Sequence, residues 1–306
     1  MRKWIAIAAV FVMLVGLLYC LFPRNVEIHE KITIAVNPRA FTRQIIDESK
    51  WQWWPGTKTE NKQELIFFEY RGNRYTVIEK KLTSLVIQIT KEKDSLLTEL
   101  IFIPVQNDSV QLNWATMQNP GTKSSNWTRH LDSDIQLIFE KIRSFYSNED
   151  NIYGFHIQNE FVADSNYLFT SFSSKEYPST ALVYGHIDRL QQYIRSNNAQ
   201  STGYPMLNLY RGNDSTYFAK VALPVDKKLG NSGDIQYRWM LKGGNILVTE
   251  VVGGPHTIEA AFQEMENYVQ DHQRVAPAIP FQSLVTDRTK QPDTSKWMTR
   301  LYWPVM

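Results

Sequence analysis

The feature that most constrains the fold is a spacing that occurs twice in the C-terminal half. Residues 192–194 (QYI) are followed, eleven residues on, by a segment that opens at Pro205. Residues 267–269 (NYV) are followed, again eleven residues on, by a segment that opens at Pro280. Each copy then reaches an aromatic-rich stretch ending in Pro-Val, at residues 217–225 and 297–305. Two copies are too few for a solenoid, so the spacing predicts a pseudo-twofold domain of two strand–helix–strand–strand units.

Apolar residues at helical spacing predict one helix in each copy. The first helix has Ile187, Leu190 and Ile194; the second has Ile258, Ala261, Phe262, Met265, Tyr268 and Val269. Strands over residues 236–241 and 245–252 flank a Lys-Gly-Gly turn at 242–244, which predicts a β-hairpin. Two such units give one antiparallel sheet with both helices on one face. The surfaces that meet at the twofold then form a cleft for a small molecule.

Several segments of this half resemble the gyrase-inhibitor-like (GyrI-like) effector-binding family, which includes drug-binding domains of bacterial transcription regulators. The resemblance rests, in order, on residues 153–154 (YG), 251–254 (VVGG) with the following helix, 279–287 (IPFQSLVTD) and 296–305 (KWMTRLYWPV). It covers residues 152–306. The family implies a cleft that receives cationic, aromatic ligands on an acidic residue, which takes part in catalysis in hydrolytic relatives.

The position that matches this acidic residue is Gln282. An amide offers only dipoles to a buried cation, whereas a carboxylate neutralises it. The alternatives are therefore a cleft for a neutral ligand, a cleft filled by its own side chains, or a charge supplied by Glu250. We expect Gln282 to face the cleft, and Gln282→Glu to raise affinity for aromatic cations. The expected aromatic neighbours are Tyr210, Trp297, Tyr302 and Trp303.

An uncharged apolar run at residues 4–22 follows Arg2 and Lys3. As a helix it would rise about 28 Å, close to the hydrocarbon thickness of a bilayer. A cleaved signal peptide is the alternative, but no small-residue cleavage site follows the run. The sequence therefore predicts a retained single-pass inner-membrane anchor, with the globular part in the periplasm or otherwise outside the cytoplasm.

Between the anchor and the duplicated half, the order of predicted elements is a strand, a short helix, five strands and a long helix. The first strand covers residues 26–36, Asn37-Pro38 opens the short helix, and the long helix covers 131–145. This order, with the WQWWP run at 51–55, resembles the START-like, polyketide cyclase (SRPBCC) family. The resemblance implies a helix-grip fold, in which a curved sheet and the long helix enclose a hydrophobic cavity.

The predicted organisation is α+β in three parts. Residues 1–25 form the transmembrane anchor, 26–150 a START-like helix-grip domain, and 151–306 the duplicated β-α-β-β GyrI-like domain. The polar segment at 147–151 separates the last two.

The chemistry-bearing residues favour binding over catalysis. The six histidines form no metal-binding pair, and the single cysteine, Cys20, lies within the anchor. We assign no catalytic residue, no metal and no cofactor, and a net charge of +2 gives no sign of a nucleic-acid partner. The sequence predicts a membrane-tethered protein that binds a hydrophobic or aromatic small molecule. A hydrolase or cyclase acting on such a ligand and an interaction scaffold with closed cavities are the alternatives.

Overall fold

The computed structural model describes residues 13, 28–47, 58–59, 66–117, 130–163 and 166–306. The chain divides into two units, one ending at Asn148 and one beginning at Glu149. Each unit is α+β and has its own antiparallel sheet. The expected anchor and the WQWWP run lie outside the described residues. None of the described helices combines the length and apolar character needed to cross a membrane.

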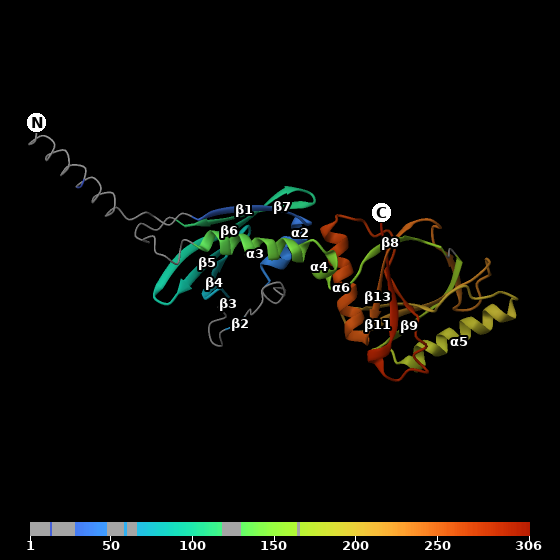
Figure 1. Cartoon of the computed structure of the whole chain (residues 1–306). Coiled ribbons are helices and arrows are strands. Elements are labelled where there is room, and N and C mark those ends of the chain that lie inside the picture. The colour runs from blue at the N-terminus through green and yellow to red at the C-terminus, as the bar shows by residue number, and fades with distance from the viewer. Residues whose placement is uncertain (1–12, 14–27, 48–57, 60–65, 118–129, 164–165) are drawn as a thin grey trace, which may run out of the picture. The chain divides into compact units, whose positions relative to one another are not determined.

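In its described residues from 28 onward, unit 1 has a seven-stranded sheet and the helices α2 and α3 (Figure 1). Its strands are β1 (His29–Ala35), β2 (Lys58–Thr59), β3 (Ile66–Tyr70), β4 (Asn73–Lys80), β5 (Ser84–Lys91), β6 (Asp94–Gln106) and β7 (Ser109–Thr116). They lie in the order β1-β7-β6-β5-β4-β3-β2. The helices are α2 (Pro38–Ile45) and α3 (Leu131–Tyr146). The described order of strand, short helix, strands and long helix is the one predicted from the sequence.

Local sequence explains where the helices of unit 1 start and which faces they bury. Asn37 caps α2, since its Oδ1 accepts hydrogen bonds from two backbone N–H groups, and Pro38 takes the first helical position. The apolar residues Ile135, Ile138, Phe139 and Ile142 recur at helical spacing in the sequence, and in α3 all four are buried. Between α3 and the sheet, Trp114 contacts Phe139 and Tyr75, each with ring centroids 6.0 Å apart. Aromatic side chains therefore pack between this helix and the sheet.

Unit 2 contains eight strands and three α-helices. The strands are β8 (Gln158–Phe161), β9 (Asn166–Ser174), β10 (Met206–Arg211), β11 (Tyr217–Pro224), β12 (Gln236–Trp239), β13 (Asn245–Val252), β14 (Phe281–Leu284) and β15 (Met298–Pro304). The helices are α4 (Glu149–Tyr153), α5 (Thr180–Ser196) and α6 (Pro255–Asp271), with the short 3₁₀ helix η3 (Thr294–Lys296). The helix α4 occupies part of the segment at 147–151 that reads as a polar linker, because its Ile152 and Tyr153 are buried.

The eight-stranded sheet is symmetric about its centre. Its order is β12-β9-β11-β10-β14-β15-β13-β8, so each strand of the first copy has a counterpart in the second at the same distance from the β10–β14 pair. At that pair Leu207 lies opposite Gln282 and Met206 opposite Ser283. The strand–helix–strand–strand order occurs twice, as β9-α5-β10-β11 and β13-α6-β14-β15. This is the arrangement that the repeated spacing predicts.

The predicted hairpin over residues 236–252 is wrong. Strand β12 pairs with β9, whereas β13 pairs with β15 and β8, in the other half of the sheet. The turn itself is present, with Gly243 at φ 78°. Its backbone bonds to Val162 instead, because Gly243 N donates to the Val162 carbonyl and Val162 N donates to the Gly244 carbonyl, both at 2.9 Å. The turn therefore carries the chain from one half to the other.

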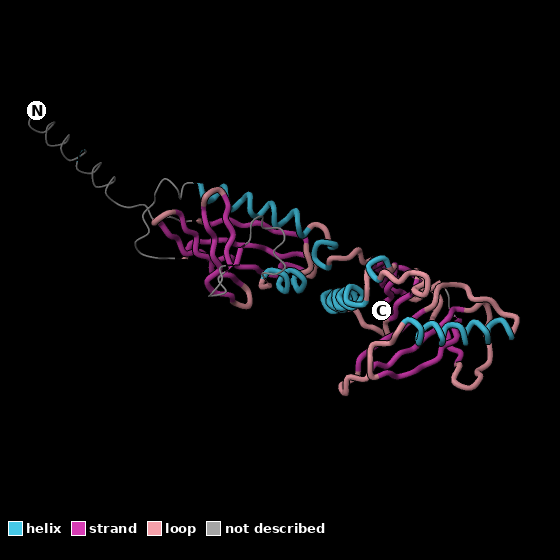
Figure 2. The backbone as a smooth tube through the Cα atoms, turned by 90° about the horizontal axis from the view of Figure 1, so that it is seen from below, coloured by secondary structure: helices cyan, strands magenta, loops and turns pink. Residues whose placement is uncertain are grey.

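Helix α5 packs along one face of this sheet (Figure 2). Its predicted apolar residues Ile187, Leu190 and Ile194 are buried with Leu207 of β10 and Leu284 of β14. Register partners in an antiparallel sheet share a face, so Gln282 lies on the same face as Leu207. The sequence thus brings one polar side chain to the centre of an apolar, helix-covered surface.

Candidate functional site

A small cavity lies beside the amino end of α5. It is lined by Tyr177, Pro178, Thr180, Val183, Tyr184, Leu207, Leu209, Arg288 and Trp297. These residues come from the loop before α5, the first turns of α5, β10, and the segment between β14 and β15. The cavity measures about 20 Å³, the space of about one water molecule.

Arg288 is the charged member of this lining and is only 8% exposed. Its Nη2 donates to Gln282 Oε1 at 3.0 Å and to Thr299 Oγ1 at 3.1 Å. Its guanidinium carbon lies 4.4 Å from the centre of the Trp297 ring, a distance at which a cation is attracted to the ring face. The Gln282 amide therefore binds a cation that the chain itself provides.

No carboxylate of the described residues forms an ion pair with Arg288. The neighbouring Asp287 is bound instead by Lys290, at 2.9 Å between Oδ2 and Nζ. The Arg288 Nε is buried and makes no hydrogen bond to the residues that the structure describes. Burial lowers the pKa of Arg288 from its ordinary value, but arginine remains charged in proteins. The site thus contains a buried positive charge whose Nε is a buried donor without an acceptor among the described residues.

Two tyrosines add neutral hydroxyl groups. The Tyr184 hydroxyl accepts a hydrogen bond from Arg288 N at 2.8 Å and donates to the Thr286 carbonyl at 3.4 Å. Burial raises the pKa of Tyr184 and of Tyr177, so both hydroxyls keep their protons at neutral pH. The Tyr177 hydroxyl can therefore serve as a hydrogen-bond donor, whereas the Tyr184 hydroxyl already donates to Thr286.

The structure brings two of the six sequence-predicted site residues to this place. Gln282 is 3% exposed and holds Arg288, and Trp297 lines the cavity. Trp297 is fixed in turn by its Nε1, which donates to the Gln291 carbonyl at 2.8 Å. Gln282 lies on the helix-covered face of the sheet, opposite Leu207.

The other four predicted residues have different surroundings. Tyr210 is exposed and stacks on Phe218, with ring centroids 5.1 Å apart. Tyr302 stacks on Phe281 at 5.0 Å, and Trp303 lies 6.4 Å from Phe262 of α6. Glu250 is exposed on β13, with its Oε1 3.2 Å from Arg300 Nε. None of these four lines the cavity beside α5.

Sequence reasoning missed Arg288, Tyr177 and Tyr184. Arg288 comes directly after the 279–287 segment that carries the family resemblance, on a connection that also holds Asp287, Lys290, Asp293 and Lys296. With several charged residues on one connection, no sequence pattern singles out Arg288. The two tyrosines gave no signal either, because tyrosines on a helix and in a loop most often contribute to ordinary packing.

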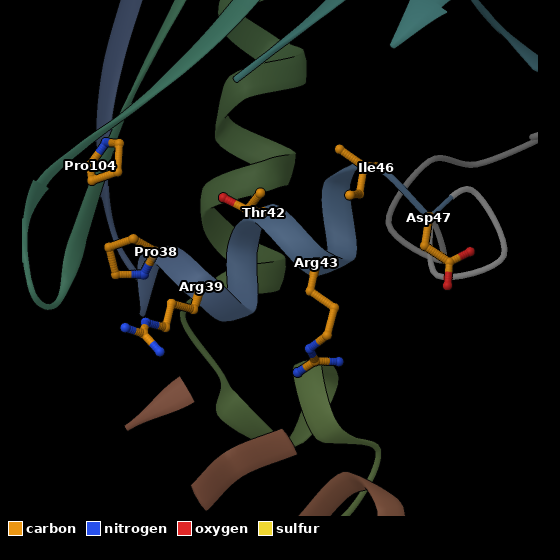
Figure 3. Close-up of a pocket in the computed structure, with 7 residues that line it drawn as sticks. All are labelled: Pro38, Arg39, Thr42, Arg43, Ile46, Asp47 and Pro104. Atoms are coloured by element: carbon orange, nitrogen blue, oxygen red, sulfur yellow. The ribbon is translucent and has the colours of Figure 1, made fainter. Parts of the chain in front are cut away.

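A larger pocket, of about 700 Å³, lies in unit 1. Its lining is Pro38, Arg39, Thr42, Arg43, Ile46 and Asp47 of α2 and its end, with Pro104 of β6. In Figure 3 these side chains point in different directions and do not converge on one centre. Ligand sites place a few polar groups so that they converge. We therefore take the smaller cavity of unit 2 as the candidate site.

Neither a protein-family model nor a curated protein matches the sequence. Among solved structures, the EcmrR C-terminal domain aligns at 14% identity over 50% of this chain and 98% of its own, with a TM-score of 0.42. SAV2435 bound to tetraphenylphosphonium aligns at 15% identity over 49% and 94%, with a TM-score of 0.32. A START superfamily protein from Mycobacterium smegmatis aligns at 11% identity over 40% and 97%, with a TM-score of 0.29. Identities this low carry over neither a ligand nor an activity.

Proposed function

We propose that unit 2 binds an apolar or aromatic small molecule in the cavity beside α5. The observation that supports this is the composition of its wall. Aromatic and aliphatic side chains surround a single buried cation, and small-molecule sites typically combine an apolar lining with a few fixed polar groups.

Binding requires the wall to move, since a space of about 20 Å³ is far smaller than a drug-sized ligand. The part of the wall best suited to move is the loop at 175–179, between β9 and α5. Its Tyr177 is 42% exposed and packs edge-on against Tyr217, with ring centroids 5.7 Å apart. Rotation of Tyr177 toward solvent would open the cavity above Leu209. A ligand that binds the open form better than the closed form shifts the population accordingly.

A second candidate, the interaction scaffold, is favoured by the small size of the cavity in the closed form. A hydrolase or cyclase remains an alternative, but the described lining offers tyrosine hydroxyls and a guanidinium, a set better suited to holding a ligand than to acting as a general base. Binding and scaffold functions differ in one measurable respect, because only the first retains a small molecule.

Native mass spectrometry of the full-length protein, purified in mild detergent from its own cells, tests the proposal. We expect a bound mass that Leu209→Trp removes, because the larger ring fills the cavity. The matched control is Leu182→Trp, on the exposed side of α5, which should keep that mass. A protein that carries no small molecule and binds none from an aromatic ligand library would support the scaffold.

We also propose that residues 4–22 tether the protein to the inner membrane, with both units outside the cytoplasm. The support is the length of the apolar run and the basic residues before it. After alkaline carbonate extraction the full chain should stay with the membrane, and a chain lacking residues 4–22 should be released. A mature protein that begins near Val26 would show that the run is cleaved.

A further inference from the structure

The charge of the ligand can be inferred from the same cavity, and this step rests on the function proposed above. We propose that the ligand is an organic anion with an aromatic or apolar body, and that its carboxylate pairs with Arg288. The GyrI-like resemblance implies a cationic ligand, whereas the geometry of this cavity points to the opposite charge.

The first step concerns the unused donor. Arg288 is more than nine-tenths buried and lines the cavity, and its two Nη2 bonds to Gln282 and Thr299 fix the plane of the guanidinium. Its Nε is left without a hydrogen bond among the described residues. A buried donor without an acceptor costs about 1–3 kcal/mol, more if charged. Since the Nε atom is itself buried, a ligand oxygen reaches it only when the cavity opens, and a negatively charged oxygen would then remove most of that cost.

The second step concerns the end of α5. Thr180, the first residue of this 17-residue helix, lines the cavity, so the amino end of the helix lies at its wall. That end carries the positive pole of the helix dipole and favours an anion. Arg288 and the helix end therefore act in the same direction. A cation placed between them would be repelled by both.

The third step explains the role of Gln282. Because its side chain is neutral, it orients Arg288 through a hydrogen bond and leaves the positive charge in place. A glutamate at this position would lie about as close to Nη2 and would neutralise Arg288 within the protein. The departure from the family's acidic residue is thus what makes a positively charged cavity. Gln282→Glu should consequently abolish the anion site. In contrast to the expectation from the family resemblance, it should not create a cation site.

The test compares three probes that share one aromatic body: 2-naphthoate, 2-naphthamide and 2-naphthylmethylammonium. Titration calorimetry on the full-length protein, at neutral pH and low salt, should show 2-naphthoate binding roughly tenfold to a hundredfold more tightly than the amide. The ammonium should bind most weakly. Gln282→Glu and Arg288→Gln should both remove the preference for the anion, and Arg288→Lys should keep part of it. Circular dichroism of each variant establishes that it is folded.

The outcomes separate this inference from the proposed function. If the amide or the ammonium binds as tightly as 2-naphthoate, and Leu209→Trp abolishes that binding, the cavity binds ligands but the inferred charge is wrong. If the preference for 2-naphthoate persists in folded Gln282→Glu, Arg288 is not its anchor and the inference fails. If no probe binds, or Leu209→Trp leaves the binding unchanged, the proposed function fails together with it.

Discussion

The two halves of unit 2 have the same strand order but differ where the helix begins. In the first half, five residues connect β9 to α5, and Ser179 caps the helix through a bond from Leu182 N. In the second half, only Gly253 and Gly254 separate β13 from α6, and no side chain caps the helix. The longer connection of the first half forms the wall of the cavity. The short one is packed closely against Thr257 and Thr294.

This difference shows how a symmetric scaffold gains a one-sided site. The symmetry fixes the sheet and places both helices, but it does not fix the connections. A short connection closes the helix onto the strand, whereas a longer one leaves room for side chains that line a cavity. Arg288, which follows β14 of the second half, then reaches the cavity beside α5 of the first. Residues of both halves therefore line the cavity, although only the first half has the longer connection before its helix.

The largest expected effect is that of Gly253→Ala, which distorts the short connection between β13 and α6. Gly253 has φ +150°, and an added Cβ would lie 2.6 Å from Thr257 Oγ1. Backbone strain and the clash should together lower the free energy of unfolding by about 2–3 kcal/mol. Gly185→Ala is the matched control, because Gly185 lies within α5 with no atom near its Cβ position. It should stabilise the protein by about 0.5–1 kcal/mol. Urea unfolding of the full-length protein measures both, and an equal response at the two glycines would contradict the comparison.

An intermediate effect should follow when the cavity is made apolar. In the double variant Gln282→Leu, Arg288→Met the buried charge and its acceptor disappear together, which should stabilise the protein by about 1–2 kcal/mol. Arg288→Met alone should instead destabilise it by about 1–3 kcal/mol, since Gln282 Oε1 and Thr299 Oγ1 lose their donor. Thermal unfolding distinguishes the signs. A double variant less stable than the wild type would mean that the charge supports the fold rather than a ligand.

The smallest effect concerns the opposite ends of the two helices. At the end of α5, Asn197 Nδ2 donates to the Tyr193 carbonyl at 2.9 Å; at the end of α6, His272 Nδ1 lies 2.9 Å from the Tyr268 carbonyl. The carboxylate of Glu149, 3.5 Å from His272 Nε2, raises the pKa of His272, and the same pairing lowers the pKa of Glu149. The second cap is therefore charge-dependent, and the first is not.

The sign of the pH dependence follows from these directions. The His272 contribution is complete below its ordinary pKa of about 6.5 and is lost as pH rises through the raised pKa. The Glu149 contribution is complete above about 4.5 and is lost as pH falls through the lowered pKa. Unit 2 should thus be most stable between these values and lose less than about 1 kcal/mol toward pH 8, as Glu149 is half-exposed. His272→Asn, which copies the cap of α5, should flatten the dependence of the free energy of unfolding on pH. An unchanged dependence in this variant would show that the Glu149–His272 pair does not contribute to it.

Much of the fold follows from sequence patterns, and the exceptions have physical causes. Apolar periodicity is a strong signal for buried helices, and it identified the stripes of α3 and α5. The Gly-Gly turn at 243–244 has the local chemistry of a hairpin. The pairing of a strand, however, depends on the strands available elsewhere in the sheet, and β12 pairs with β9. Local propensity cannot reveal such a competition.

The site was less predictable, because it depends on which side chains converge. Alternation along β14 puts Gln282 and Leu284 on one face, and in the structure both are buried. Of the four expected aromatic neighbours, only Trp297 lines the cavity. Arg288 could not be placed from the pattern, since its side chain leaves a connecting segment rather than a strand. The membrane anchor at residues 4–22, its orientation and the binding of a small molecule stay predictions.

The narrow junction at the centre of the larger sheet has a consequence for how this unit folds. Strands β10 and β14 share only two residue pairs, and Asn208 Nδ2 adds a bond to the Pro280 carbonyl, 72 residues along the chain. Within each half, β10 and β14 have neighbours much closer in sequence, β11 and β15. Because closing a long loop costs entropy before any contact rewards it, we expect the halves to form early and the junction late. The last event of folding would then bring Gln282 opposite Leu207 and complete the cavity.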